Sequence, residues 1–241
     1  MSVKVADADI YNADGVLLIA KGQQLTDEVV GRLQRLCIEK AMQSEQLAQS
    51  RLQEFKNIYL RHKNAEFNTV SQIVSEEIFS SKSRPWWVSI NALSNYVDWV
   101  YTHSIDVALI SLTIANQLKC SRAKMHEICL GALLHDIGKM LIPKHIIEKP
   151  GKLSEQEKVL VRQHCELGGC IVKGFGLPKS CTDIILQHHE RLDGSGYPYG
   201  LTENQISGEA KIVMIADVLD AMTSYRPYKP AKAMNAAIDD L

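Results

Sequence analysis

The chain has 241 residues and a formal net charge of −1, with 46% hydrophobic and 23% charged residues. This length suits one large domain, or a medium domain with a smaller one, and the composition is that of a globular protein. The near-zero charge excludes a chain-wide basic face for duplex DNA, although a single cleft can still be basic.

The chain begins without a signal-peptide pattern, and its most apolar stretch, 97–118, contains Asp98, His103, Asp106 and Asn116. We therefore expect no membrane span and a cytoplasmic protein. None of the six cysteines belongs to a CxxC pair. They are predicted to be reduced, mostly buried thiols.

The N-terminal part differs in pattern from the rest. Strand candidates at 3–11 and 16–20 flank an Asp-Gly turn, and Thr26 is a predicted helix N-cap. Residues 41–80 have helical spacing and are predicted to form a connecting helix. We predict a small α+β hairpin-and-helix module with its connecting helix over residues 1–80, which contacts a regulatory partner or forms a homodimer.

The second part, residues 86–241, is predicted to be a nearly all-helical domain. A capping box at Ser154 and Glu157 and an Asp-Gly-Ser-Gly-Tyr-Pro loop at 193–198 are its clearest local signals. The expected helices cover approximately 88–118, 121–135, 144–148, 154–173, 179–189 and 207–224.

Histidines and aspartates recur where packing alone would favour apolar residues. His135 and Asp136 close the apolar helix end 128–134, and a buried carboxylate needs a cation or strong hydrogen bonds. Alone, each such residue is more often a hydrogen-bonded core histidine or a paired aspartate. Their recurrence in five segments favours a metal site of imidazoles and carboxylates. The segments carry His103, His135 with Asp136, His164, His188 with His189, and Asp217.

Several motifs together resemble the HD-GYP branch of the HD-domain phosphohydrolases. They are HDIGK at 135–139, HHERLDGSGYP at 188–198, YTHSIDVALI around His103, the His164 helix and IADVLDAMTSYRPYK at 215–229. The resemblance covers roughly residues 96–230 and implies a mostly α fold, an HD-type helical bundle. It also implies hydrolysis of cyclic di-GMP or, as in some members, of cyclic GMP-AMP.

The resemblance further implies two divalent metal ions, iron or manganese, with other divalent metals left open. One ion would take His103, His135 and Asp217, and the other would take His164, His188 and His189. Asp136 would bridge both, and a hydroxide between the ions would be the nucleophile for in-line attack on phosphorus.

Five further positions are implied to contact the substrate: Lys139, Tyr197, Asp220, Arg226 and Lys229. Lys139 would offset charge on the phosphate oxygens, and Arg226 and Lys229 would contact phosphate or base. Asp220 would tether a guanine edge or orient a ligand. The alternative for the cations is ordinary solvation, and the loop glycines and Pro198 would then only shape a turn.

Two departures from the family pattern bear on these expectations. Trp99 stands where some members carry a Glu that helps to hold a third metal, so we expect two ions. Leu241 follows Lys229 by only twelve residues, where the family usually continues into further helix. Whether the C-terminus is complete therefore stays open.

The leading hypothesis is an enzyme that opens cyclic di-GMP to linear pGpG, and whether pGpG is degraded onward to GMP is left open. The alternatives are a phosphodiesterase for 3'3'-cyclic GMP-AMP, a sensor that binds a cyclic dinucleotide without hydrolysis, and a phosphohydrolase of mononucleotides. The glycine-tyrosine-proline loop and the RPYK segment disfavour the last of these.

Overall fold

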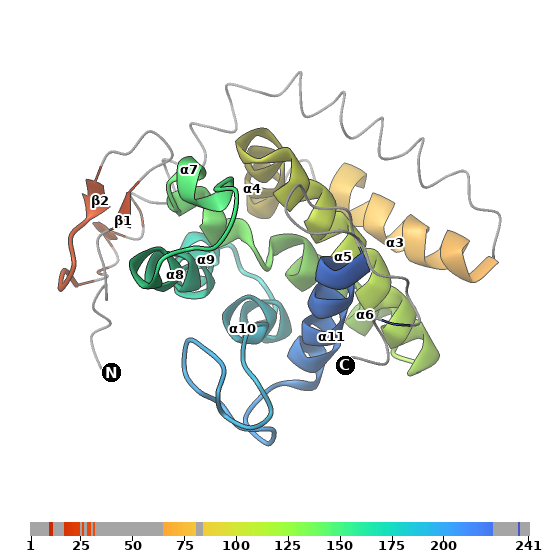
Figure 1. Ribbon diagram of the computed structural model, residues 1–241. Helices are drawn as coiled ribbons and strands as arrows, with labels where there is room; N and C mark the ends of the chain where they lie inside the picture. The colour runs from red at the N-terminus through yellow and green to blue at the C-terminus, as the bar shows by residue number, and fades with distance from the viewer. Residues whose placement is uncertain are drawn as a thin grey trace.

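A computed structural model of the protein describes residues 84–223 without a break and residues 65–80, together with residues 10–11, 17–24, 26, 28–29, 31 and 236. This part of the chain is nearly all helical, as predicted (Figure 1). The helices are α3 (Ala65–Ser80), α4 (Pro85–Tyr96), α5 (Asp98–Gln117), α6 (Arg122–Leu134), the 3-10 helix η1 (Ile137–Leu141), α7 (Lys144–Ile147), α8 (Glu155–Arg162), α9 (His164–Val172), α10 (Lys179–Gln187) and α11 (Gly208–Thr223).

The described N-terminal residues form a short hairpin. Strand β1 (Ile10–Tyr11) pairs antiparallel with β2 (Leu17–Ile19), and Ile10 lies opposite Ile19. Thr26 accepts a hydrogen bond from the backbone N–H of Val29 at 3.3 Å, as expected of an N-cap. The predicted strand pairing is confirmed, whereas the Asp-Gly turn and most of the connecting helix lie outside the described residues. The division at residues 80–86 stays a prediction.

The core of the bundle lies where α5 packs against both α6 and α11, and α10 extends it from α6 to α9 (Figure 1). Each of these helices turns an apolar face inward, and the side chains of Val107, Leu133, Ile184 and Val213 are fully buried there. Burial of such side chains is the main stabilising contribution in a helical bundle. The functional histidines and aspartates are carried on these same helices.

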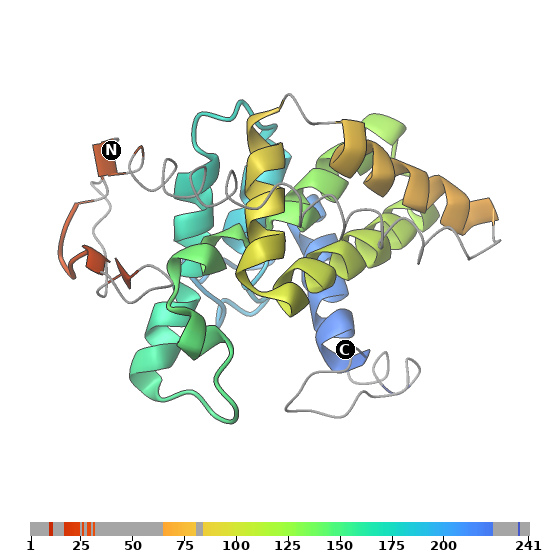
Figure 2. The ribbon, with the colours of Figure 1, turned by 90° about the horizontal axis from the view of Figure 1, so that it is seen from above.

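The predicted single helix over 88–118 is wrong, because the chain breaks at Val97. Val97 has φ −147° and ψ 115°, an extended conformation between α4 and α5. The two helices run in clearly different directions (Figure 2). The break lets α4 pack on η1, where the Tyr96 hydroxyl donates a hydrogen bond to the carbonyl of Ile142, while α5 packs on α6 and α11. Tertiary packing thus overrides a continuous helical pattern.

The predicted helix over 154–173 is also divided, at Gln163. The predicted capping box is confirmed: Ser154 Oγ accepts from Glu157 N at 3.2 Å, and Glu157 Oε2 accepts from Ser154 N at 2.7 Å. However, α8 has no buried residue, whereas most of α9 is buried. The break at Gln163 separates an exposed helix from a core helix and sets His164 at the start of the latter.

A glycine brings the two central segments together. A Cβ atom on Gly138 would lie 1.9 Å from the carbonyl oxygen of His164, so only glycine permits η1 to lie this close to α9. Gly168 of α9 lies against Gly138 in turn, with its Cβ position 3.4 Å from the Gly138 nitrogen. The glycine of the HDIGK motif therefore has a packing role that the histidine site depends on.

The described residues bear on two predictions from the sequence, the absence of a membrane span and the state of the cysteines. No helix there combines the length and the apolar character needed to cross a bilayer. The cysteines among them, Cys120, Cys129, Cys165, Cys170 and Cys181, are all free, and Cys129, Cys165 and Cys181 are buried.

Candidate metal centre

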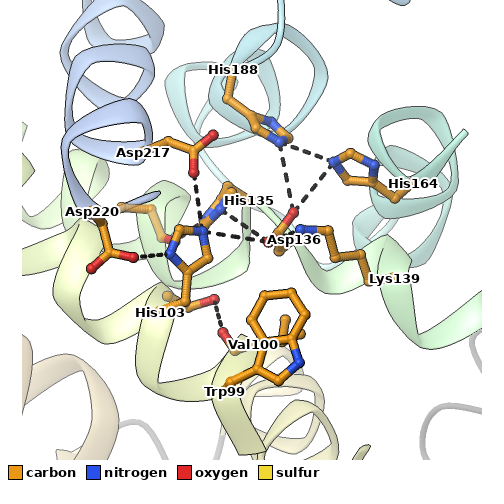
Figure 3. A network of polar contacts seen from close by, with 12 residues as sticks. Trp99, Val100, His103, His135, Asp136, Lys139, His164, His188, Asp217 and Asp220 are labelled. Atoms are coloured by element: carbon orange, nitrogen blue, oxygen red, sulfur yellow. Dashed lines mark hydrogen bonds and ion pairs between the residues drawn. The ribbon is translucent and has the colours of Figure 1, made fainter. Parts of the chain in front are cut away.

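Five separate parts of the bundle bring the predicted metal ligands together around Asp136 (Figure 3). His103 comes from α5, His135 from the end of α6, His164 from the start of α9, and His188 and His189 from the end of α10. Asp217 comes from α11. Their ligand atoms form two groups, in each of which the atoms lie within 4.8 Å of one another. The groups are Asp136, His164, His188 and His189, and His103, His135 and Asp217.

The two carboxylate oxygens of Asp136 face different histidines. Oδ1 lies 3.3 Å from Nε2 of His164 and 3.8 Å from Nε2 of His188. Oδ2 lies 3.3 Å from Nε2 of His135 and 3.7 Å from Nε2 of His103. Asp136 thus lies between the two groups with one oxygen toward each, which is the arrangement that a bridging carboxylate requires.

Backbone carbonyls fix the orientation of three of the imidazoles. Nδ1 lies 2.7 Å from the Ala132 carbonyl in His135, 2.6 Å from the Val161 carbonyl in His164 and 3.0 Å from the Ile185 carbonyl in His188. Since a carbonyl only accepts, each Nδ1 carries the proton. A neutral ring then presents the Nε2 lone pair to the cluster, as metal-binding histidines do.

His103 is held differently, between two carboxylates. Its Nδ1 lies 2.5 Å from Asp220 Oδ2, and its Nε2 lies 3.0 Å from Asp217 Oδ1. Burial alone would lower the pKa of His103, but the hydrogen bonds to Asp217 and Asp220 raise it to about 9. For the Asp217 carboxyl the directions are reversed. Burial alone would raise its pKa, but the hydrogen bond with His103 and the charge of that ring hold it below its usual range. Without a metal ion, this imidazole is protonated at neutral pH.

The residues present fit a metal ion. Asp136 Oδ1 and His135 Nε2 are buried without a hydrogen-bond partner, which is costly for polar atoms. Nε2 of His164 and Nε2 of His188 lie 3.1 Å apart, although Nδ1 carries the proton in both rings. Burial lowers the pKa of His164 to about 3 and that of His188 well below its usual value, so protons do not relieve this repulsion at neutral pH. A cation does.

Three of the five predicted substrate residues are described by the structure, and all three lie beside this cluster. Lys139 Nζ is 2.5 Å from Asp136 Oδ2; burial would raise the pKa of Asp136, but Lys139 and the imidazoles hold it well below its usual range. The Tyr197 ring lies 4.8 Å from that of His189, and burial raises the pKa of the phenol. Asp220 is buried against His103. Arg226 and Lys229 lie outside the described residues.

The sequence motifs did not predict one residue that supports the site, Glu190. Glu190 is buried, and its carboxylate accepts hydrogen bonds from the backbone N–H groups of Tyr199 (2.7 Å) and Leu201 (2.9 Å). It therefore ties the end of α10 to the loop that carries Tyr197. The only signal was its position next to the histidine pair, because its partners are backbone atoms about ten residues away.

Comparison with known proteins identifies a matching family model and several similar curated proteins. The HD domain model matches residues 88–241. The chain is 42% identical over 151 residues to "Cyclic di-GMP phosphodiesterase PA4108" of Pseudomonas aeruginosa, covering 62% of this chain and 36% of the relative. It is 36% identical over 152 residues to "3'3'-cGAMP-specific phosphodiesterase 1" of Vibrio cholerae, covering 61% and 35%. The chain thus spans about a third of the length of these curated relatives.

A solved structure shares the fold. Bd1817, an HDG"Y"P protein from Bdellovibrio bacteriovorus, is similar with a TM-score of 0.53 and 18% sequence identity, over 98% of this chain and 88% of the other. The helical bundle and the family resemblance predicted from the motifs are confirmed. On the match over residues 88–241, the chain belongs to the HD domain family.

Proposed function

We propose that the protein is a metal-dependent phosphodiesterase that opens cyclic di-GMP to linear pGpG, while onward degradation of pGpG to GMP stays a prediction from the sequence. The observation that carries the proposal is Asp136, a buried carboxylate with one oxygen toward His164 and His188 and the other toward His135 and His103. The relative from P. aeruginosa, named for cyclic di-GMP, supports the choice of substrate.

The proposed cofactor is a pair of divalent ions, iron or manganese. His103, His135 and Asp217 would hold one, His164, His188 and His189 the other, and Asp136 both. Imidazole and carboxylate donors suit these metals. Bound divalent ions lower the pKa of water from about 15.7 to about 7 and so supply a nucleophile at neutral pH.

The chain's own residues then bind and orient the substrate. The Lys139 ammonium lies beside Asp136, suitably placed to stabilise negative charge on a phosphate oxygen. Tyr197 keeps its proton and offers a hydroxyl donor and a ring beside His189. Of the two roles predicted for Asp220, we propose the orientation of His103, because its carboxylate is buried on Nδ1 of that ring. Phosphate or base contacts by Arg226 and Lys229 stay predictions.

A second substrate, 3'3'-cyclic GMP-AMP, is kept because the V. cholerae relative is named for it. Both substrates present the same phosphodiester to the metal centre, so the bases decide between them. A cytoplasmic location and regulation or dimer formation through residues 1–80 also remain predictions from the sequence.

The test is a turnover assay with metal analysis of protein purified without oxygen. We expect two metal ions per chain and conversion of cyclic di-GMP to pGpG. Asp136→Asn keeps the shape of the side chain but loses its charge, so we expect it to lose turnover by at least about 1,000-fold. Tight binding of cyclic di-GMP with no turnover by the metal-loaded wild type would instead identify a sensor.

A further inference from the structure

Trp99 carries a contact that the proposed chemistry does not yet use. The Lys139 Nζ lies 5.7 Å from the centroid of the Trp99 ring, within the range of a cation–π interaction. Figure 3 shows the indole below Asp136, with the Lys139 side chain above it and to its right. Trp99 precedes His103 by four residues in α5, so one face of this helix carries both residues to the centre.

Lys139 has two partners of unlike kind. Its ammonium is 2.5 Å from Oδ2 of Asp136, the oxygen that faces His103 and His135. An ion bound to that oxygen would repel an ammonium at this distance. Lys139 then needs another partner nearby, since its side chain is only 13% exposed.

An aromatic ring suits this purpose better than a carboxylate. A second acid beside Lys139 would hold the ammonium tightly and neutralise the charge that a phosphate oxygen needs. The face of an indole attracts the ammonium through its quadrupole and leaves the full positive charge. Trp99 also offers no lone pair that competes for a metal ion.

We propose that Trp99 is a positioning residue, which keeps the Lys139 ammonium beside the metal centre and directed at a substrate phosphate when Asp136 binds metal. This inference rests on the proposed function for its kinetic part only. The proposal gives the α5 position four residues before His103 a role in handling the substrate rather than in holding metal.

The kinetic test is a double-mutant cycle between Trp99 and Lys139 on cyclic di-GMP. Trp99→Leu should lower kcat/KM by about 5- to 30-fold, the fold-change that corresponds to a cation–π contact, and Trp99→Phe should restore most of it. In the Lys139→Met background, Trp99→Leu should change kcat/KM by less than about twofold, because the contact is already lost. Metal content should stay as in the wild type.

A second readout does not need turnover. The metal-loaded protein is treated with acetic anhydride at one fixed pH, and acylation of Lys139 is followed by peptide mass spectrometry against the exposed Lys144. Trp99→Leu should raise the relative rate at Lys139 severalfold, and Trp99→Phe should raise it less. If no variant hydrolyses cyclic di-GMP, the proposed function fails while this readout still decides the role of Trp99.

Trp86→Leu is the matched control. Trp86 is also a partly buried tryptophan with a cation over its ring, Arg84 at 5.4 Å, but it belongs to α4. It should alter neither kcat/KM nor Lys139 acylation. The proposal is overturned if Trp99→Leu lowers kcat/KM equally with and without Lys139, or leaves the acylation rate unchanged.

Discussion

The two groups around Asp136 are built from different chemistry. In the group of His103, His135 and Asp217, His103 lies between carboxylates that hold a proton on it. In the group of His164, His188 and His189, burial keeps two rings neutral, and their lone pairs face each other. A proton can therefore replace a metal ion in the first group at neutral pH, but not in the second.

This difference predicts unequal behaviour on metal loading. An ion that binds beside His103 must displace a proton, whereas an ion beside His164 and His188 meets neutral imidazoles. The first site should therefore bind metal more weakly as the pH falls from about 9 toward neutral. The second should keep its affinity over that range, because its ring pKa values lie far below it.

Among changes that separate the two groups, the largest effects are expected from removing one ligand of each group. His188→Gln and Asp217→Asn should each lower metal content from two ions to one and turnover by about 100-fold or more, because each variant removes one of the ligands of one ion. Metal analysis and initial rates on cyclic di-GMP measure both. His145→Gln, an exposed histidine of α7, is the control. If each variant lost both ions, the groups would not be separate sites.

A smaller effect is expected from Asp220→Asn, which touches only the first group. The carboxylate fixes the His103 ring through Nδ1, and loss of such a partner typically costs about 10- to 100-fold in metal affinity. We expect one ion to be lost in a chelator titration at lower chelator concentration, while the other is unaffected. Asp183→Asn, a partly buried aspartate of α10 that pairs with Lys179, serves as control. Equal weakening of both ions would contradict the assignment of Asp220.

The stability of the metal-free protein should depend on pH in opposite senses for the two groups. His103 has a folded pKa of about 9 against 6.5 unfolded, so its contribution is full below pH 6.5 and is lost as the pH rises to 9. His164 has a folded pKa of about 3, so stability falls as the pH drops below 6.5. Each of these two histidines contributes a slope of at most about 1.4 kcal/mol per pH unit.

Urea unfolding in EDTA between pH 5 and 9 measures this dependence. The free energy of unfolding should be greatest near pH 6.5 to 7. His103→Gln should flatten the alkaline limb alone, and His164→Gln should make the acidic limb less steep, because His188 and His189 still contribute to it. A wild-type curve that is level from pH 6.5 to 9 would show that the carboxylates do not hold a proton on His103.

The smallest effect concerns the loop beside the second group. Glu190→Ala leaves the N–H groups of Tyr199 and Leu201 without their acceptor, which should cost about 1–3 kcal/mol of local stability. Hydrogen exchange of these two amides should speed up, and the KM for cyclic di-GMP should rise more than kcat falls. Glu203→Ala, exposed in the same region, is the control. Unchanged exchange would mean that Glu190 does not hold the loop.

Much of the fold and the identity of the clustered residues could be predicted from local signals. The cap at Ser154, the end of α6 at His135 and the start of α11 after Ser207 are set by neighbouring residues. The breaks at Val97 and Gln163 depend on what α4 and α9 pack against, which no local pattern contains. The contact of His103 with Asp220 spans 117 residues, and the Trp99–Lys139 contact joins two helices. Such partners require the assembled bundle.

The most direct test of the central claim is an anomalous-scattering map from crystals of the manganese-loaded protein. We expect two peaks flanking Asp136, one beside His103, His135 and Asp217, and the other beside His164, His188 and His189. A single peak, or peaks that Asp136 does not contact, would contradict a centre in which this carboxylate is shared by two ions.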